Sequence, residues 1–467
     1  AEVWICAHAC RAEIAPMTTG HERWQLRGLR ELFEHLALHI DTKISVRLWD
    51  GSEIALGHSV EPGLAVSIAS PGVIGSLLRR PTLDNLLRHY ACKHIDIHGA
   101  DLYTFVETAR QKRLRHGTRH VSKWLVAKSL APFLFTKAES TAVDHCYDGD
   151  QTGHNRRQAD NKDYIQFHYD LSNEFYSQFL DPEMVYSCAY FTDWSNSLQQ
   201  AQHDKLDMIC RKLRLQPGER FLDIGSGWGA LICHAAQHYG VSAHGVTLSE
   251  QQLQWTQKKI NSLGLQERVT VALQDYAELS GTWEKIASIG MVEHVGIANM
   301  RLYMSTVSSL LPDRGMFLCH GITRPAKKSA KQFRRMRPER KLLAKYIFPG
   351  GELDHLGHML DTMEACKFEV HDVEGWRDHY ALTCKHWCQN LSAHKEEAID
   401  LVGEERYRMW LLYLAGVSFA LESGSARSYQ TVATKHDDKG LSGMPPTRAH
   451  LYETSAKAPA PRRLDAA

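Results

Sequence analysis

The clearest chemical pattern in the 467-residue chain is a glycine-rich turn, Leu222-Asp-Ile-Gly225-Ser-Gly227-Trp-Gly229. Glycines at such a turn let a ligand approach the backbone with no Cβ in the way. A dinucleotide-binding turn has the spacing G-x-G-x-x-G with an acidic residue about 20 positions later, and a Walker loop ends in lysine. Here the spacing is G-x-G-x-G, the acidic residue Asp223 precedes the glycines, and no Walker lysine follows. The turn therefore argues against NAD and against a Walker-type phosphate loop.

The same turn resembles the nucleotide loop of class I methyltransferases. That resemblance implies S-adenosylmethionine as the methyl donor, with Asp223 at the methionine amine of the donor. A sulfonium cation is stabilised beside aromatic faces and needs no phosphate cradle. The alternative for these glycines is a tight structural turn between a strand and a helix.

Further motifs occur in order across residues 164–430. They occupy residues 168–176, 180–191, 290–296, 317–322, 348–352 and 379–383. Together they resemble cyclopropane-fatty-acyl-phospholipid synthases and the related mycolic-acid methyltransferases. The resemblance implies transfer of a methylene from S-adenosylmethionine to the cis double bond of an unsaturated phospholipid acyl chain. The alternative within this chemistry is a lipid C-methyltransferase that makes methyl-branched or methylene fatty acids, and a third reading is a non-enzymatic lipid carrier.

An alkene that attacks a sulfonium methyl leaves a carbocation, so the pocket must be dry and aromatic. Rings near the donor turn are Tyr169, Phe175, Tyr176, Tyr186, Tyr190, Phe191 and Trp228. In the family the base is a bound bicarbonate. Carried over to this chain, its ligands are Cys188, Glu293, His320, the backbone of Ile322, and Tyr380. A thiolate nucleophile is the alternative for Cys188, and core roles are the alternative for Cys188, Glu293 and His320.

The resemblance also implies a donor-binding set. Its members are Tyr186, Ser187, Asp223, Gly225, Gly227, Trp228, Gly229, Thr247, Gln252, Asp275 and Tyr276. The chain departs from the family at Ser226, where many bacterial synthases have cysteine, and at residues 422–427. The second departure bears on acyl-chain or head-group preference and not on the donor site.

These residues need a scaffold, and residues 164–430 alternate between strand and helix patterns as in a parallel sheet. Expected strands are 220–224, 241–246, 269–273, 286–289 and 315–321, and expected helices are 230–239, 249–263 and 299–311. The predicted fold is α/β, a Rossmann-like doubly wound sheet of the class I methyltransferase type. Residues 431–467 read as a disordered tail.

A small α+β domain is predicted over residues 21–109. Expected helices are 24–39 and 71–90, and expected strands are 43–49, 65–69 and 94–98. It shows no catalytic pattern, so a structural or docking role is favoured, and bacterial members of the resembled family carry a lipid-binding-like module here.

Residues 110–163 read as a connector. It carries cations at Arg110, Lys112, Arg113, Arg115, Arg119 and Lys123, followed by the apolar stretch 124–135. Such a segment suits an anionic membrane surface, and the alternative is a solvated helix face followed by a packed helix. Residues 139–163 read as a mobile linker.

Composition bears on the partners, the metal content and the location of the protein. The net charge is +1, which disfavours nucleic acid as a partner. The 11 cysteines show no CxxC pair, and the 27 histidines carry no recognised motif, so no metal site is predicted. No signal peptide or spanning segment is expected. The predicted location is cytoplasmic and peripheral to the inner membrane, with unsaturated phospholipids as partners and a homodimer left open.

Overall fold

The computed structural model describes residues 20–40, 42–110, 121–141, 143, 145–150, 154–155, 160–169 and 171–452. The chain divides into two compact units, Ala1–Asp144 and His145–Ala467. Among the described residues, no helix is long and apolar enough to cross a membrane. Of the predicted basic connector, residues 111–120 lie outside the described residues.

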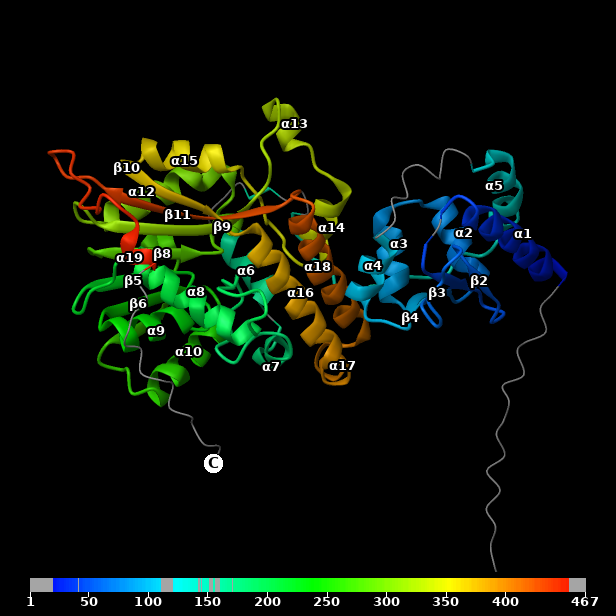
Figure 1. Cartoon of the computed structure of the whole chain (residues 1–467), viewed down its shortest axis with the longest axis horizontal. Helices are drawn as coiled ribbons and strands as arrows, with labels where there is room; N and C mark the ends of the chain where they lie inside the picture. The colour runs from blue at the N-terminus through cyan, green and yellow to red at the C-terminus, as the bar shows by residue number, and fades with distance from the viewer. Residues whose placement is uncertain are drawn as a thin grey trace, which may run out of the picture. The chain divides into compact units, whose positions relative to one another are not determined.

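The first unit is a small sheet packed against helices (Figure 1). Its strands are β1 (Ser45–Arg47), β2 (Glu53–Ala55), β3 (Ala65–Ile68) and β4 (Ile95–His98), in the order β2-β1-β3-β4. Its helices are α1 (Gly20–Ala37), α2 (Pro71–Arg79), α3 (Leu83–Ala91), α4 (Leu102–Arg110) and α5 (Lys123–Leu130). Apolar residues from α1, β1, β2 and α2 meet in one core that includes Leu29, Val46, Ile54 and Ile74.

One expectation for this unit was wrong. The predicted helix over 71–90 is two helices, because Arg80-Pro81 interrupts it and Thr82 caps α3 by accepting a hydrogen bond from the backbone N of Asn85 at 3.2 Å. Proline lacks the N–H that an interior helical position donates, so a helix ends before it. The short strand β2 was not predicted.

The second unit is built on a sheet that, within the described residues, has seven strands in the order β10-β11-β9-β8-β5-β6-β7. These strands are β5 (Arg220–Ile224), β6 (Ser242–Thr247), β7 (Val269–Leu273), β8 (Lys285–Ile289), β9 (Met316–Thr323), β10 (Phe368–Gly375) and β11 (Arg427–Lys435). Neighbours from β7 through β9 are parallel, whereas β11 is antiparallel to both β9 and β10. β11 extends past residue 430, and the described chain continues to α19 (Ala449–Tyr452).

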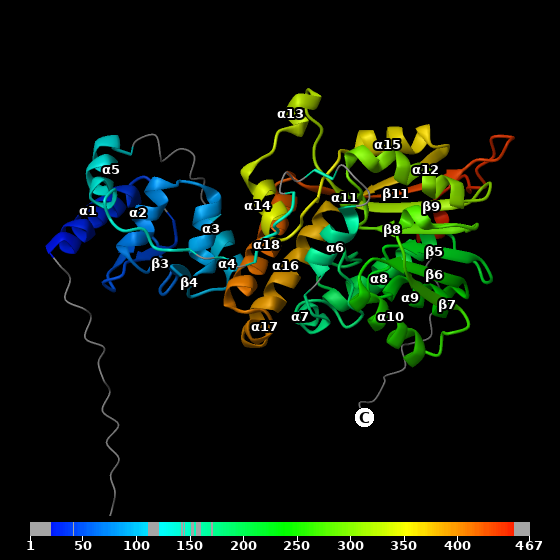
Figure 2. The same ribbon diagram turned by 180° about the vertical axis from the view of Figure 1, so that it is seen from behind.

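Helices cover both faces of this sheet. α8 (Leu198–Lys212), α9 (Ala230–Tyr239) and α10 (Glu250–Ser262) lie on one face, and α12 (Met300–Leu310) and α15 (Leu356–Ala365) on the other (Figures 1 and 2). The remaining helices are α6 (Asn161–Tyr169), α7 (Asn173–Ser177), α11 (Val292–Val295), α13 (Ala330–Arg334), α14 (Pro338–Tyr346), α16 (Arg377–Ala393), α17 (Lys395–Val402) and α18 (Glu404–Glu422). This layering matches the predicted α/β class.

Alternation along β5 assigns its side chains to the two faces. Phe221 packs in the core with α8 and α9, whereas Leu222 and Ile224 pack in the core with α12. Successive residues of a strand point to opposite faces, so Asp223 belongs to the α8 and α9 face. This placement decides the surroundings of Asp223, the residue predicted to contact the methionine amine of the methyl donor.

Candidate functional site: a donor recess beside a buried carboxyl group

The glycine turn closes β5 and opens α9. Gly225 has φ +84°, and a Cβ there would lie 2.5 Å from the side chain of Met291. The backbone N–H groups of Gly225 and Ser226 both donate to the carbonyl of Val246, each at 3.0 Å. Only glycine allows this positive φ together with so close an approach. The turn thus brings bare backbone to the carboxyl ends of β5 and β6.

A recess opens at these carboxyl ends and encloses about 570 Å³ of space, part of it open to solvent. It lies where the strand order reverses between β5 and β8, which is where open α/β sheets bind ligands. Predicted donor residues that line it are Gly225, Gly227, Thr247, Gln252 and Tyr276. Thr247 Oγ1 donates to Gln252 Oε1 at 2.7 Å, which holds the polar part of the wall.

The other six residues of the predicted donor-binding set lie outside this lining, namely Tyr186, Ser187, Asp223, Trp228, Gly229 and Asp275. Tyr186 Oη donates to Tyr413 Oη at 3.2 Å, and Ser187 Oγ accepts a hydrogen bond from Lys205 Nζ at 3.0 Å. Asp275 caps a short 3₁₀ turn by accepting from the backbone N of Ala277 at 2.8 Å. Gly229, with φ +82°, is the N-cap of α9. The structure gives these residues positions around the recess without placing them in its wall.

Asp223 is buried on the far side of the same turn. Its Oδ1 has no hydrogen-bond partner among the described residues. Burial raises the pKa of Asp223 to about 7, and the charge of Lys205 opposes that rise. Burial likewise lowers the pKa of Lys205 to about 8, against the pull of Asp181. Because Asp223 points toward α8, it acts on the recess through the position of the glycine turn.

An aromatic cluster adjoins the recess. Trp228 Nε1 donates to Asn173 Oδ1 at 2.7 Å, and its ring lies 5.0 Å from Tyr176 and 6.1 Å from Tyr169, between ring centroids. Tyr176 in turn lies 5.5 Å from Tyr186. The cluster consists of Tyr169, Phe175, Tyr176, Phe179, Tyr186, Trp228, Trp387 and Trp410.

Two predicted rings belong to a different group. Tyr190 stacks at 4.8 Å on both Trp376 and His379, and Phe191 lies 6.3 Å from His379. The expectation that these two rings stand beside the donor turn is thus not matched by their contacts.

Glu293 is a buried carboxyl group on α11, directly after β8. Its Oε1 accepts a hydrogen bond from the backbone N of Ile322 at 2.6 Å, whereas its Oε2 has no partner among the described residues. Burial raises the pKa of Glu293 to about 7. Gly321 makes this contact possible, since a Cβ there would lie 2.1 Å from Val292 Cγ2. A carboxyl group with this pKa can exchange a proton near neutral pH.

His320 is buried on β9 with both ring nitrogens engaged by β11. Lys212 Nζ donates to Gln430 Oε1 at 2.7 Å, which leaves the Gln430 amide to donate to His320 Nδ1 at 3.3 Å. Nε2 must then carry the proton and donate to Ser428 Oγ at 2.8 Å. Burial, with Lys205 and Lys212 adding to it, lowers the pKa of His320 well below its ordinary value. The ring is therefore neutral and hydrogen-bonded within the chain, and Ile322 N is held by Glu293.

Cys188 and Tyr380 complete the set implied by the resemblance. The pKa of the Cys188 thiol is raised well above its ordinary value. Burial is the largest cause, and the charge of Cys384 is the next. A thiol is a poor nucleophile when protonated, so this environment disfavours the thiolate alternative. Burial also raises the pKa of the Tyr380 hydroxyl, with smaller contributions that include Glu293 and Cys188. The three side chains therefore act on one another electrostatically.

Comparison with known proteins assigns the chain to a family. The sequence profile described as mycolic acid cyclopropane synthetase matches residues 155–431. The chain belongs to this mycolic acid cyclopropane synthetase family. It is 35% identical over 427 residues to a probable fatty acid methyltransferase of Pseudomonas putida, covering 89% of this chain and 97% of that protein. It is 38% identical over 274 residues to the cyclopropane-fatty-acyl-phospholipid synthase of Escherichia coli K12, covering 59% of this chain and 68% of that protein.

Solved structures of the mycolic acid cyclopropane synthetase family give the same result. The cyclopropane synthase MmaA2 from Mycobacterium tuberculosis aligns with a TM-score of 0.55 at 32% identity, over 59% of this chain and 98% of that chain. A mycolic acid cyclopropane synthase complexed with SAH and CTAB aligns with a TM-score of 0.56 at 34% identity, over 59% of this chain and 98% of that chain. The predicted class I methyltransferase fold and family are confirmed, and the chain is a S-adenosylmethionine-dependent methyltransferase of a lipid-modifying family.

Several residues of this family member were missed by sequence reasoning. Gln274, Gly290, Met291 and His294 line the recess, and Lys205 and Asn173 hold predicted site residues. His294 directly follows Glu293, so the motif at 290–296 already contained a signal for it. Lys205 and Gln430 carry no local signal, because their partners are distant in the sequence.

Proposed function

We propose that this chain is a cyclopropane-fatty-acyl-phospholipid synthase, which adds a methylene from S-adenosylmethionine across the cis double bond of an unsaturated phospholipid acyl chain. One observation carries the proposal: the buried Glu293 carboxyl group adjoins residues that line the donor recess. Tyr169 lines the recess. Burial is the first cause that raises the pKa of Tyr169, and the charge of Glu293 is the second. His294 also lines the recess, one residue from Glu293.

The chain's own residues hold the reactants and exclude water. When bound, S-adenosylmethionine supplies an electrophilic methyl group. Gly225, Gly227, Thr247, Gln252 and Tyr276 would hold it in the recess. The aromatic cluster would present ring faces that stabilise a cationic acyl chain and would limit the access of water to it.

Ring closure needs a base near the added carbon. We propose that bicarbonate serves as this base, with Glu293, Tyr380 and Cys188 as its ligands. The support is the unpaired Oε2 of Glu293 and its effect on the pKa of Tyr380. His320 would join this set only by giving up its hydrogen bonds to Ser428 and Gln430. The backbone N of Ile322 would join it only by giving up its hydrogen bond to Glu293.

A second candidate is a fatty acid C-methyltransferase that leaves a methyl branch or a methylene group. It is favoured by the similarity over 89% of this chain to a protein named as a probable fatty acid methyltransferase. In both candidates the alkene attacks the sulfonium methyl group and leaves a cation on the neighbouring chain carbon. Loss of a proton from the added methyl closes the cyclopropane, and loss of a proton from the chain leaves a methyl branch beside a double bond. A methylene group forms when a 1,2-hydride shift precedes loss of the methyl proton, so the position of the base and the lifetime of the cation decide between the products.

The test is incubation of the full chain with S-adenosylmethionine and liposomes of an unsaturated phospholipid. A synthase adds one CH₂ per reacted double bond, and NMR of the recovered fatty acid shows cyclopropane protons with loss of vinyl protons. A methyl branch or a methylene group in the NMR spectrum supports the second candidate. Unmodified lipid in the presence of bound donor refutes both. Removal of dissolved CO₂, with bicarbonate added back, tests the base separately.

We further propose that the first unit contacts the bilayer through the segment after α4. Trp124 is 71% exposed and Phe135 is 96% exposed, and Lys128 Nζ lies 5.3 Å from the Trp124 ring. Exposed aromatic rings beside lysine suit the interface of an anionic membrane. Trp124→Ala/Phe135→Ala should weaken sedimentation with vesicles that contain phosphatidylglycerol. The matched control is Leu302→Ala/Leu441→Ala, at exposed positions of the second unit, and equal binding by both variants contradicts the proposal.

A further inference from the structure

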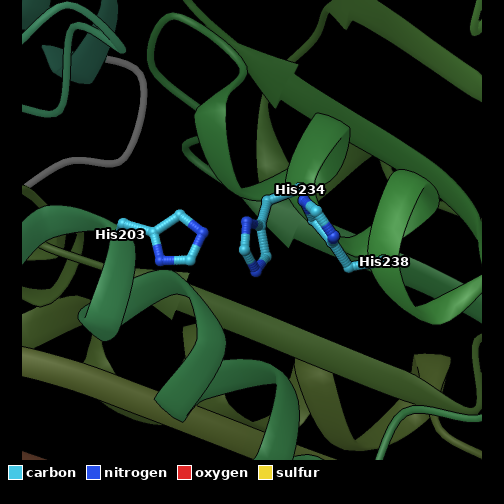
Figure 3. Close-up of side chains that lie close together, drawn as sticks. All are labelled: His203, His234 and His238. Carbon is cyan, nitrogen blue, oxygen red and sulfur yellow. The ribbon is translucent and has the colours of Figure 1, made fainter. Parts of the chain in front are cut away.

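Three histidines outside the donor recess meet between α8 and α9. His203 lies on α8, and His234 and His238 lie one turn apart on α9. Their rings face one another across the gap between the two helices (Figure 3). None of them is used in the proposed function.

The geometry of the three rings is compact. One ring nitrogen from each residue lies within 4.8 Å of the others. Ring centroids are 4.5 Å apart for His234 and His238, 5.2 Å for His203 and His234, and 6.3 Å for His203 and His238. Tetrahedral zinc with Zn–N bonds of about 2.0–2.1 Å separates its nitrogens by about 3.3 Å. The side chains of His203 and His238 are exposed, so zinc binding would need them to move closer to His234 to reach that spacing.

His234 supplies the observation that points to a ligand. Its side chain is buried, with 7% of the residue exposed, and its Nε2 has no hydrogen-bond partner among the described residues. Burial lowers the pKa of His234 to about 3, and His238 and His203 lower it further. With the proton on Nδ1, the unpartnered Nε2 of this buried ring would offer its lone pair to a metal ion.

The surroundings of His203 orient its ring. Nδ1 of His203 lies 4.0 Å from Asp204 Oδ1, within ion-pair distance and beyond hydrogen-bond distance, and Asp204 raises the pKa of His203. A nearby carboxylate attracts one edge of the ring and leaves the other nitrogen to face away from it. The edge of the His203 ring away from Asp204 points toward His234 (Figure 3).

We propose that His203, His234 and His238 bind one Zn²⁺ ion, with water as the fourth ligand. Imidazole nitrogens suit zinc and other late first-row metals, whereas Mg²⁺ and Ca²⁺ require oxygen ligands. The two lysines that lower the pKa of His234, Lys205 and Lys259, disfavour the added charge, and Asp204 and Asp207 near His203 oppose them.

Zinc at this place would join α8 to α9. α9 begins at Gly229 of the donor turn, and Lys205 and Gln202 of α8 hold Ser187 through its Oγ and carbonyl at 3.0 and 2.9 Å. The ion would therefore stabilise the two helices that support the donor recess. The expected effect is a higher unfolding temperature, independent of any turnover.

The test uses the full chain without a histidine tag, stripped with a chelator and titrated with ZnCl₂ by calorimetry. We expect one equivalent of zinc and a rise in the unfolding temperature. Co²⁺ in place of zinc should give the intense visible bands of a tetrahedral site. His203→Ala and His238→Ala, which change exposed side chains, should each weaken the affinity by at least about tenfold. The matched control His436→Ala, at an exposed histidine outside the cluster, should bind as the parent chain does.

Three results overturn the proposal. These are the absence of stoichiometric zinc, a weak octahedral Co²⁺ spectrum, and equal zinc affinity for His203→Ala and the parent chain. Because the two variants leave the buried His234 in place, a circular dichroism spectrum like that of the parent chain separates loss of the site from loss of the fold.

Discussion

Glu293→Gln allows the buried carboxyl group to be tested through stability as well as through turnover. The variant keeps an oxygen that can accept the hydrogen bond from Ile322 N, made at 2.6 Å in the parent chain, so the contact between α11 and β9 is retained. It removes the ionisable group whose pKa burial raises from 4.5 to about 7. A glutamine cannot charge, so the variant loses the cost of burying a carboxylate.

The sign follows from proton binding. Between pH 4.5 and 7 the folded chain holds a proton on Glu293 that the unfolded chain releases, so the parent chain loses stability as the pH rises. A shift of about 2.5 pKa units corresponds to a free energy on the order of 3 kcal/mol, reached in full above pH 7. The free energy of unfolding of Glu293→Gln minus that of the parent should therefore increase by about 2 to 3 kcal/mol from pH 5 to pH 8.

Urea unfolding at several pH values measures this difference, and calorimetry with S-adenosylmethionine measures donor affinity. Turnover should fall while donor affinity stays nearly unchanged, because Glu293 is proposed to hold the bicarbonate base and not to contact the sulfonium donor. The control is Glu267→Gln, whose side chain is exposed in the turn before β7, and its stability difference should be the same at each pH. A pH-independent difference for Glu293→Gln would refute the burial argument, and parallel loss of turnover and donor affinity would refute the assigned role.

Three further predictions concern single contacts. Gly321→Ala places a Cβ 2.1 Å from Val292 Cγ2, so α11 must shift and turnover should fall while the chain stays folded by circular dichroism; unchanged turnover would contradict the packing argument. Trp228→Phe removes the 2.7 Å hydrogen bond to Asn173 Oδ1, which should cost about 1 kcal/mol of unfolding free energy and weaken donor affinity in calorimetry, with Trp194→Phe, at an exposed tryptophan, as the control. Cys188→Ser should retain measurable turnover in the liposome assay because the thiol is protonated at neutral pH. Complete loss of turnover with donor binding intact would instead support the alternative in which the Cys188 thiolate is a nucleophile.

Local pattern predicted most of the elements that carry the donor turn. The strands Arg220–Ile224 and Val269–Leu273 and the helix Ala230–Tyr239 have the bounds expected from periodicity. β5 is buried on both faces and α9 over its first two turns, so short apolar runs bounded by turn residues set these limits. Periodicity failed over residues 71–90, where a proline interrupts the apolar pattern, and at β2, which has only three residues.

The sequence by itself determined the family, the glycine turn and part of the recess wall, because these depend on residue types at short spacing. Only the tertiary structure decided which groups meet. Trp410 of α18 joins the aromatic cluster, Ser428 and Gln430 of β11 hold His320, and His203 reaches the two histidines of α9. Asp223 turned out to face α8 because side chains alternate along β5. Such contacts join segments far apart in the sequence, and hydrophobic periodicity carries no information about them.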